Sequence, residues 1–248
     1  MSFTRHRRTS YFALTAAVAL SLSACTSTPA PGKAKTSSSS TATSAATTAP
    51  TAATVYQLMR KSGAAAKSVH IRGAFTDKGQ KLQIDIAGDR AGKNMRALVN
   101  DGNGQVEILT AEGNVYVKAD AAYWTKNGSA AIAKVAAGKY VKAPASASGL
   151  DALKVGTLLD QIVASDMSSA DKLNTKVQTT VVDGAPAYLM TTKVGEDAKI
   201  YVSADGRARL LRVEGPKSQP GTLVFTQWDA VAPVSAPSAD QLAQIPGM

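Results

Sequence analysis

From residue 69 onward, apolar and polar side chains alternate along much of the chain. Successive side chains of a β-strand point to opposite faces, so a period of two is typical of strands with one covered face. Turn sequences such as Asp101-Gly102-Asn103-Gly104 separate the alternating segments and predict antiparallel hairpins. Strands are predicted at residues 69–76, 81–86, 95–100, 105–110, 114–119, 175–182, 185–192, 199–203, 210–214 and 222–228.

Three segments have helical rather than strand spacing. A first amphipathic helix is predicted because five residues fall near one helical face: Val55, Leu58, Met59, Ser62 and Ala66. Helical excursions are also predicted over the Ala-rich residues 128–138 and over residues 150–166. Together with about eleven strands, they indicate an α+β domain dominated by one large antiparallel sheet that should curl strongly.

The N-terminus has the features of a bacterial lipoprotein signal peptide. A basic start is followed by an apolar run at residues 11–22, well short of the ~20 residues that span a bilayer. The run ends in Leu22-Ser23-Ala24-Cys25, which matches a lipobox, and Cys25 is the chain's single cysteine. Residues 1–24 are therefore predicted to be removed and Cys25 to carry a diacylglyceryl anchor on the extracytoplasmic face of the cell membrane. The alternative is a plain secretory signal with a chance cysteine.

Composition divides the rest of the chain in two. Residues 26–53 are almost entirely Ser, Thr, Ala, Pro, Gly and Lys, without Val, Ile, Leu or an aromatic residue. Such a segment cannot bury a core, so residues 25–53 are predicted to form a lipidated cysteine and a disordered tether. Residues 54–248 contain no second run long enough to cross a membrane and are predicted to fold as one domain.

The chain is basic, with 28 Lys and Arg against 18 Asp and Glu. Cleavage after residue 24 would remove three arginines and no acid, lowering the net charge from +10 to +7. No dense Lys/Arg cluster appears and only 13 residues are aromatic (7 Tyr, 2 Trp, 4 Phe), which disfavours nucleic acid as a partner. Two explanations of the net positive charge remain: dispersed charge that keeps the protein soluble, and attraction to a membrane surface.

Few residues are available for catalysis or metal binding. The chain has one Cys and two His, and His6 lies within the predicted signal peptide. The remaining His70 is predicted on the polar side of a strand, without a second His or a Cys to share a metal. No Gly-x-Ser-x-Gly, phosphate-binding Gly-rich loop or His-Glu-x-x-His motif occurs. No enzyme, metal or cofactor is therefore predicted, and only carboxylates paired by the fold would leave an enzymatic alternative.

Several segments, in their order along the chain, resemble actinobacterial lipoproteins of the LppX/LprG type. The resemblance begins with the lipobox and the tether and extends over roughly residues 54–236 of the domain. It rests on Ser68-Val69-His70-Ile71-Arg72-Gly73, on Asn114-Val115-Tyr116-Val117-Lys118-Ala119-Asp120 with Tyr123-Trp124, on Ile200-Tyr201-Val202-Ser203-Ala204-Asp205-Gly206 with Leu210-Leu211-Arg212-Val213, and on Phe225-Thr226-Gln227-Trp228-Asp229.

The resemblance implies a fold similar to the lipoprotein carrier LolA, a half-open antiparallel barrel with helices packed on its concave face. It further implies a hydrophobic cavity that accepts acyl chains of lipids or glycolipids in transit across the cell envelope, with an envelope exporter as a partner. It offers no catalytic residues. The candidate lining consists of the inward positions that alternation already identifies: Val69, Ile71, Phe75, Leu82, Ile84 and Ile86.

The sequence leaves two alternatives to a lipid-binding cavity. The inward residues could pack into a dry core instead of lining a cavity. The protein could also be an adaptor or envelope-sensing lipoprotein that binds a protein partner and moves no lipid. A cavity open to solvent would favour the carrier, whereas a filled core with an exposed apolar patch on its rim would favour the adaptor.

Overall fold

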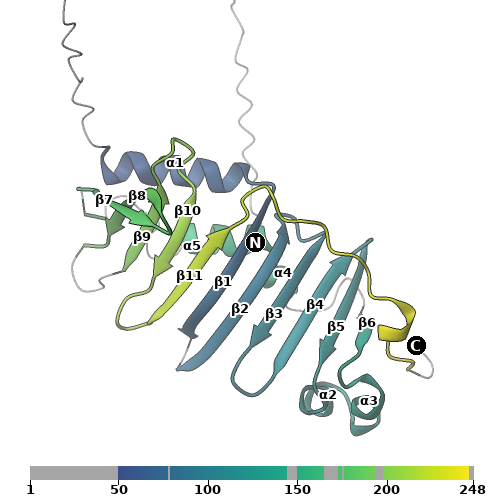
Figure 1. Ribbon diagram of the computed structural model, residues 1–248. Helices are drawn as coiled ribbons and strands as arrows, with labels where there is room; N and C mark the ends of the chain where they lie inside the picture. Colours follow the sequence, from purple (N-terminus) through teal and green to yellow (C-terminus); the bar gives the residue numbers. More distant parts are fainter. Residues whose placement is uncertain are drawn as a thin grey trace, which may run out of the picture. The chain divides into compact units, whose positions relative to one another are not determined.

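The computed structural model describes residues 50–77, 79–143, 150–164, 173–174, 176–193 and 198–245 (Figure 1). They belong to one compact unit, Thr47–Met248. The predicted signal peptide, Cys25 and almost all of the predicted tether lie outside the described residues. Their assignment and the domain boundary therefore stay predictions.

The unit is built on one antiparallel sheet of eleven strands in the order β6-β5-β4-β3-β2-β1-β11-β10-β9-β8-β7. The sheet is open, with β6 and β7 at its two edges, so the predicted α+β class with a large half-open sheet is confirmed. The strands are β1 (Ser68–Asp77), β2 (Gln80–Asp89), β3 (Met95–Asn100), β4 (Gln105–Ala111), β5 (Asn114–Ala119), β6 (Tyr140–Ala143), β7 (Gln178–Val182), β8 (Ala185–Thr191), β9 (Lys199–Ser203), β10 (Leu210–Glu214) and β11 (Gly221–Thr226).

Two runs of hairpins meet at the centre of this sheet. Strands β1 to β6 follow one another outward in chain order, and β7 to β11 follow one another inward until β11 pairs with β1. Ile71 lies opposite Phe225 across the β1/β11 junction and opposite Ile86 on β2. The ten strands predicted from alternation are all present, and β6 is the one the sequence does not reveal, because four residues are too few to show a period.

The helices differ more from their predictions than the strands do. The predicted helix 128–138 is present as α3 (Ala130–Ala136), but it is preceded by an unpredicted helix, α2 (Ala121–Asn127). The predicted helix 150–166 is divided at Lys154 into α4 (Leu150–Leu153) and α5 (Val155–Ala164). A short 3-10 helix, η2 (Ala239–Gln241), lies near the C-terminus.

Helix α1 (Ala52–Ala65) begins two residues inside the predicted tether, where the Thr51 hydroxyl accepts a hydrogen bond of 3.2 Å from the Thr54 amide. Its predicted apolar face is wrong in one respect: Leu58 is 50% exposed. A helix turns about 100° per residue, so the face that buries the larger Tyr56 leaves Leu58 outside. The buried residues of α1 are Ala52, Val55, Tyr56, Met59 and Gly63.

Helices α1 and α5 cover one face of the sheet, here called the inner face. Val55 and Met59 of α1 and Leu159 of α5 belong to the same hydrophobic cluster as Ile71 and other inner-face strand residues. A smaller cluster of Leu109, Tyr116 and Tyr140 lies on the opposite, outer face and is covered by Ala236 and Leu242 of the C-terminal segment. The prediction that helices pack on one face of the sheet is thus confirmed.

Candidate functional site

The six candidate lining residues all lie on the inner face, but to different depths. Val69, Ile71 and Ile86 have no exposed surface, and Ile84 is 8% exposed. Phe75 and Leu82 lie opposite each other across β1 and β2 and are half-buried. The inner face is therefore closely packed at one end of these two strands, beneath α1 and α5, and more open at the other.

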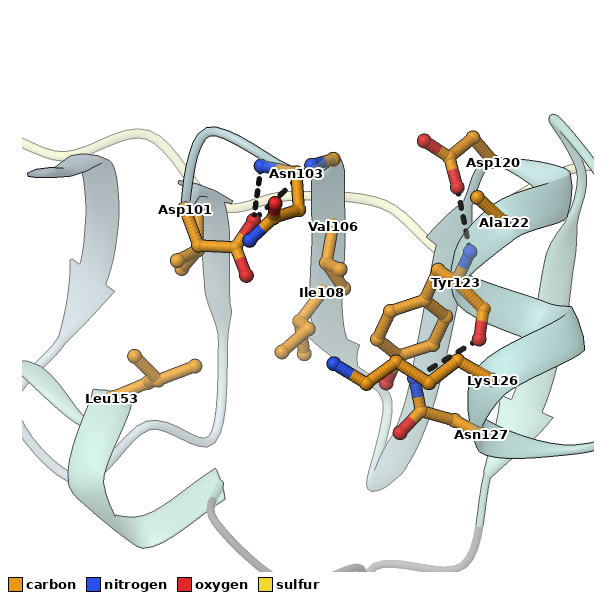
Figure 2. Close-up of a pocket in the computed structure, with 12 residues that line it drawn as sticks. Asp101, Asn103, Val106, Ile108, Asp120, Ala122, Tyr123, Lys126, Asn127 and Leu153 are labelled. Carbon is orange, nitrogen blue, oxygen red and sulfur yellow. Dashed lines mark hydrogen bonds between the residues drawn. The ribbon is translucent and has the colours of Figure 1, made fainter. Parts of the chain in front are cut away.

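A cavity of about 500 Å³ lies farther along the same face (Figure 2). Its apolar floor is formed by Val99 of β3 with Val106 and Ile108 of β4, and Leu153 of α4 forms part of its wall. Val99 lies opposite both Val106 and Ile84, so the floor continues the row of residues that contains the candidate Ile84. The described lining residues include none of the six candidates, and the cavity begins one strand beyond them.

The rim of this cavity is polar and comes from two segments. The turn between β3 and β4 contributes Asp101, Asn103 and Gly104, and α2 with its N-cap contributes Asp120, Ala122, Tyr123, Lys126 and Asn127. Figure 2 shows the Lys126 side chain extending from α2 across the cavity toward Ile108. An apolar floor below a polar rim suits an amphiphile better than a fully polar ligand.

Both rim carboxylates already have local partners. Asp101 Oδ1 accepts hydrogen bonds from the backbone amides of Asn103 at 2.9 Å and Gly104 at 3.1 Å. The amide of Asn103 in particular lowers the pKa of the Asp101 carboxyl. Asp120 caps α2, with its Oδ1 2.8 Å from the Tyr123 amide. These contacts agree with the prediction that Asp101 is a turn residue, and they make Asp120 the N-cap of α2.

His70 lies away from the cavity. As predicted, it is on the polar side of β1, where its Nε2 is 2.8 Å from Asp85 Oδ1 on the outer face. Within the described ranges, no group of three or more His, Cys, Asp or Glu side chains could hold a metal ion. No helix in the same ranges is both long and apolar enough to cross a membrane.

The sequence contains a signal for the floor of the cavity but not for its rim. Val99, Val106 and Ile108 lie in predicted strands, and pairing these strands with each other and with the strand of Ile84 places all three on the face of Ile84. No comparable sequence pattern predicts that α2 forms part of the rim of the cavity. None of its seven residues is buried, so no amphipathic pattern marks it.

No protein-family model and no curated protein matches the chain. Among solved structures, a crystal structure of the Mycobacterium tuberculosis lipoprotein LppX is similar, with a TM-score of 0.43 and 13% identity, covering 74% of this chain and 98% of that one. A crystal structure of an uncharacterized conserved protein from Thermus thermophilus has a TM-score of 0.33 and 10% identity, covering 76% of this chain and 95% of that one. LppX is of the family that the sequence resembles. At these scores neither similarity assigns a function.

Proposed function

We propose that this protein binds the acyl chains of lipids or glycolipids on the inner face of its sheet, at the cavity above Val99, Val106 and Ile108. The observation that carries the proposal is the cavity itself, about 500 Å³ in volume, with an apolar floor and a polar rim. This volume lies within the ~300–1,000 Å³ usual for small-molecule sites. Each methylene transferred from water to such a floor contributes ~0.8 kcal/mol before the cost of ordering the chain.

The proposed site includes the more open part of the predicted lining. Ile84 adjoins Val99, and the half-buried Phe75 and Leu82 lie on the same face nearer the strand ends. An acyl chain that leaves the cavity floor can pass the nearly buried Ile84, which is 8% exposed, and continue along the half-buried Phe75 and Leu82. Val69, Ile71 and Ile86 would meet lipid only if α1 and α5 moved, because these residues are wholly buried in the cluster that contains both helices.

The proposal also includes the localisation of the protein. Cys25 would anchor the chain to the extracytoplasmic face of the cell membrane, and the domain would hold lipid in transit across the envelope, with an exporter as its partner. The lipobox and the absence of a second cysteine support the anchor. No residue of the proposed site acts as a catalyst.

The alternative of a protein-binding adaptor has less support. It needs a continuous apolar patch on the surface. In the described part of the chain, the large apolar side chains that are well exposed are Leu58, Val135 and Val181, which belong to three separate elements, α1, α3 and β7. Isolated apolar residues of this kind are normal on monomers.

The test is a tryptophan substitution in the cavity, Val106→Trp, combined with native mass spectrometry of protein purified from its own membranes. Val106 is half-buried and faces the cavity, so added bulk should occupy the space of the lipid. We expect the wild type to carry extractable lipid and the variant to lose most of it, with little change in thermal stability.

Two further variants control this experiment. Gln83→Trp adds the same bulk at an exposed outer-face position on β2 and should change neither lipid content nor stability. Ile71→Trp inserts it into the closed part of the inner face and should destabilise the domain by ~1–3 kcal/mol. A wild type without lipid, or a Val106→Trp variant as fully loaded as Gln83→Trp, would refute the proposed site.

A further inference from the structure

The N-terminal part of the chain has an unusual distribution of charge. The first acidic residue is Asp77, so nothing before it offsets the cations. Beyond the predicted signal peptide these cations are Lys33, Lys35, Arg60, Lys61, Lys67 and Arg72. Helix α1 therefore carries positive charge only, and both of its cations are exposed.

One side of α1 borders a groove of about 370 Å³ that it shares with the turn between β9 and β10. Leu58 and Lys61 line it from α1, and Arg207 and Arg209 line it from the turn. Lys67 follows the helix, and its backbone amide is 2.7 Å from Asp229 Oδ1, another lining residue. We call Leu58, Lys61, Lys67 and Arg207 the α1 basic face.

The carboxylates near this face neutralise only part of its charge. Arg209 is paired with Asp229 at 2.8 Å, and Arg207 is 3.8 Å from Asp205, whose Oδ1 also accepts the Ser203 hydroxyl at 2.6 Å. Lys61 and Lys67 have no ion pair among the described residues. Lys61, Arg207 and Arg209 thus line the groove against the single lining carboxylate of Asp229, and Lys67 and Asp205 each adjoin a lining residue in the chain. Leu58 also lines the groove, with half of its surface exposed.

The position of α1 in the chain relates this face to the membrane. Helix α1 begins at Ala52 and is the first element of the unit, directly after the segment that carries the predicted anchor. Along the chain, it is therefore the described element closest to Cys25. The intervening residues also carry two lysines and no acid, so they offer no repulsion to an anionic surface.

We propose that the α1 basic face docks on the anionic headgroup surface of a lipid bilayer. Lysine and arginine attract anionic lipids, and a single exposed leucine among them can enter the headgroup region. Docking would hold the domain against the membrane in one orientation, which the tether by itself cannot do. The inference is independent of the cargo proposal, because the groove and the cavity have no lining residue in common.

The experiment uses the full chain carrying Cys25→Ala, so that no acyl anchor contributes. Co-sedimentation is measured with vesicles of phosphatidylcholine alone and of equimolar phosphatidylcholine and phosphatidylglycerol. The excess binding to the anionic vesicles is the readout. We expect this excess to disappear near 1 M salt, where the screening length is about 3 Å.

Lys61→Gln/Arg207→Gln removes two cations of the face and should lower the excess affinity roughly 25-fold, at about fivefold per cation. The matched control, Lys81→Gln/Lys142→Gln, removes two exposed cations from the outer face on β2 and β6 and should retain the affinity of the parent. Equal losses in both pairs, or no loss in the first, would overturn the proposal.

A second readout keeps the test decisive if the double variant unfolds. Leu58→Trp places a fluorophore at an exposed position of the face. Because the parent already contains Trp124 and Trp228, the signal is the difference in emission between the variant and the parent. This difference should shift to the blue with the anionic vesicles and stay unchanged with phosphatidylcholine alone. Emission that does not respond to the anionic vesicles would contradict docking through α1.

Discussion

Replacing Gly73 with alanine is expected to destabilise the sheet at its centre. Gly73 is on β1, between Ile84 of β2 and Leu223 of β11. Its φ is +153°, and a Cβ added there would lie 1.9 Å from the carbonyl oxygen of Thr222 and 2.9 Å from its carbonyl carbon. Both contacts are with backbone, which has no rotamer by which to move away. An alanine must therefore change the β1 backbone or displace β11.

The magnitude follows from these two costs. A non-glycine residue held in such a backbone conformation costs ~1–3 kcal/mol. Displacing a packed neighbour costs a similar ~1–3 kcal/mol. Together they amount to about 2–6 kcal/mol of unfolding free energy, against the ~5–15 kcal/mol typical of a whole domain. For a domain of this size, the thermal midpoint should fall by roughly 4–24 °C.

Gly63→Ala provides a control of opposite sign. Gly63 lies in helix α1, and a Cβ there would meet nothing within 4 Å. Alanine in a helix is favoured over glycine by ~0.5–1 kcal/mol, so this variant should be slightly more stable than the parent. Thermal and denaturant unfolding followed by circular dichroism measure both variants. A Gly73→Ala variant as stable as Gly63→Ala would refute the reasoning from the Thr222 contact.

Two other predictions concern alkaline stability and anchoring. Burial, and next the charge of Glu107, raise the pKa of Tyr140 to about 12. In the unfolded chain Tyr140 would ionise near pH 10, so its un-ionised form stabilises the folded state fully below that pH. As the pH rises toward 12, the unfolding free energy should fall by ~2–3 kcal/mol, because the unfolded chain loses the Tyr140 proton first. Tyr140→Phe should flatten this part of a plot of unfolding free energy against pH, and an unchanged slope would contradict it. Cys25→Ala should release the protein from membranes into the soluble fraction after a high-salt wash without changing its melting temperature; retention with membranes would show that another element holds it.

The strands were predictable because their pattern and their turns agree. In β2, Ile84 and Ile86 are buried while Lys81 and Gln83 are exposed, and the same alternation marks most of the other strands. At the Asp183-Gly184 turn, both residues have positive φ, as hairpin turns of this kind require. The order of the strands does not follow from alternation, however. Pairing of β11 with β1 joins residues more than 140 positions apart, and no local signal specifies it.

The helices and the cavity were harder to predict for a different reason. Helical spacing around residues 55–66 allowed more than one face, and only packing against the sheet decides that Tyr56 is buried and Leu58 exposed. Helix α2 has no fully buried face, because its Tyr123 and Trp124 are only half-buried and its other residues are exposed, and it belongs to a short excursion between β5 and β6. A cavity is the space that such excursions leave over the sheet, so it depends on their placement rather than on any residue type.

The two proposed surfaces use different parts of the same sheet. The floor and most of the rim of the cavity come from β3, β4 and α2 and the residues next to them, within the first run of hairpins, and α4, which lies between the two runs, adds Leu153. The α1 basic face instead joins the first helix to the turn between β9 and β10, which belongs to the second run. The two are connected through the hydrophobic cluster that spans the β1/β11 junction, not through shared lining residues.

Substitutions in the cavity and on the basic face should therefore act additively, because sites without common partners rarely couple by more than ~0.5 kcal/mol. If loading with lipid altered vesicle binding by much more than that, α1 or α5 would have to move when the cavity is filled, and the buried Val69, Ile71 and Ile86 would then become part of the lipid site.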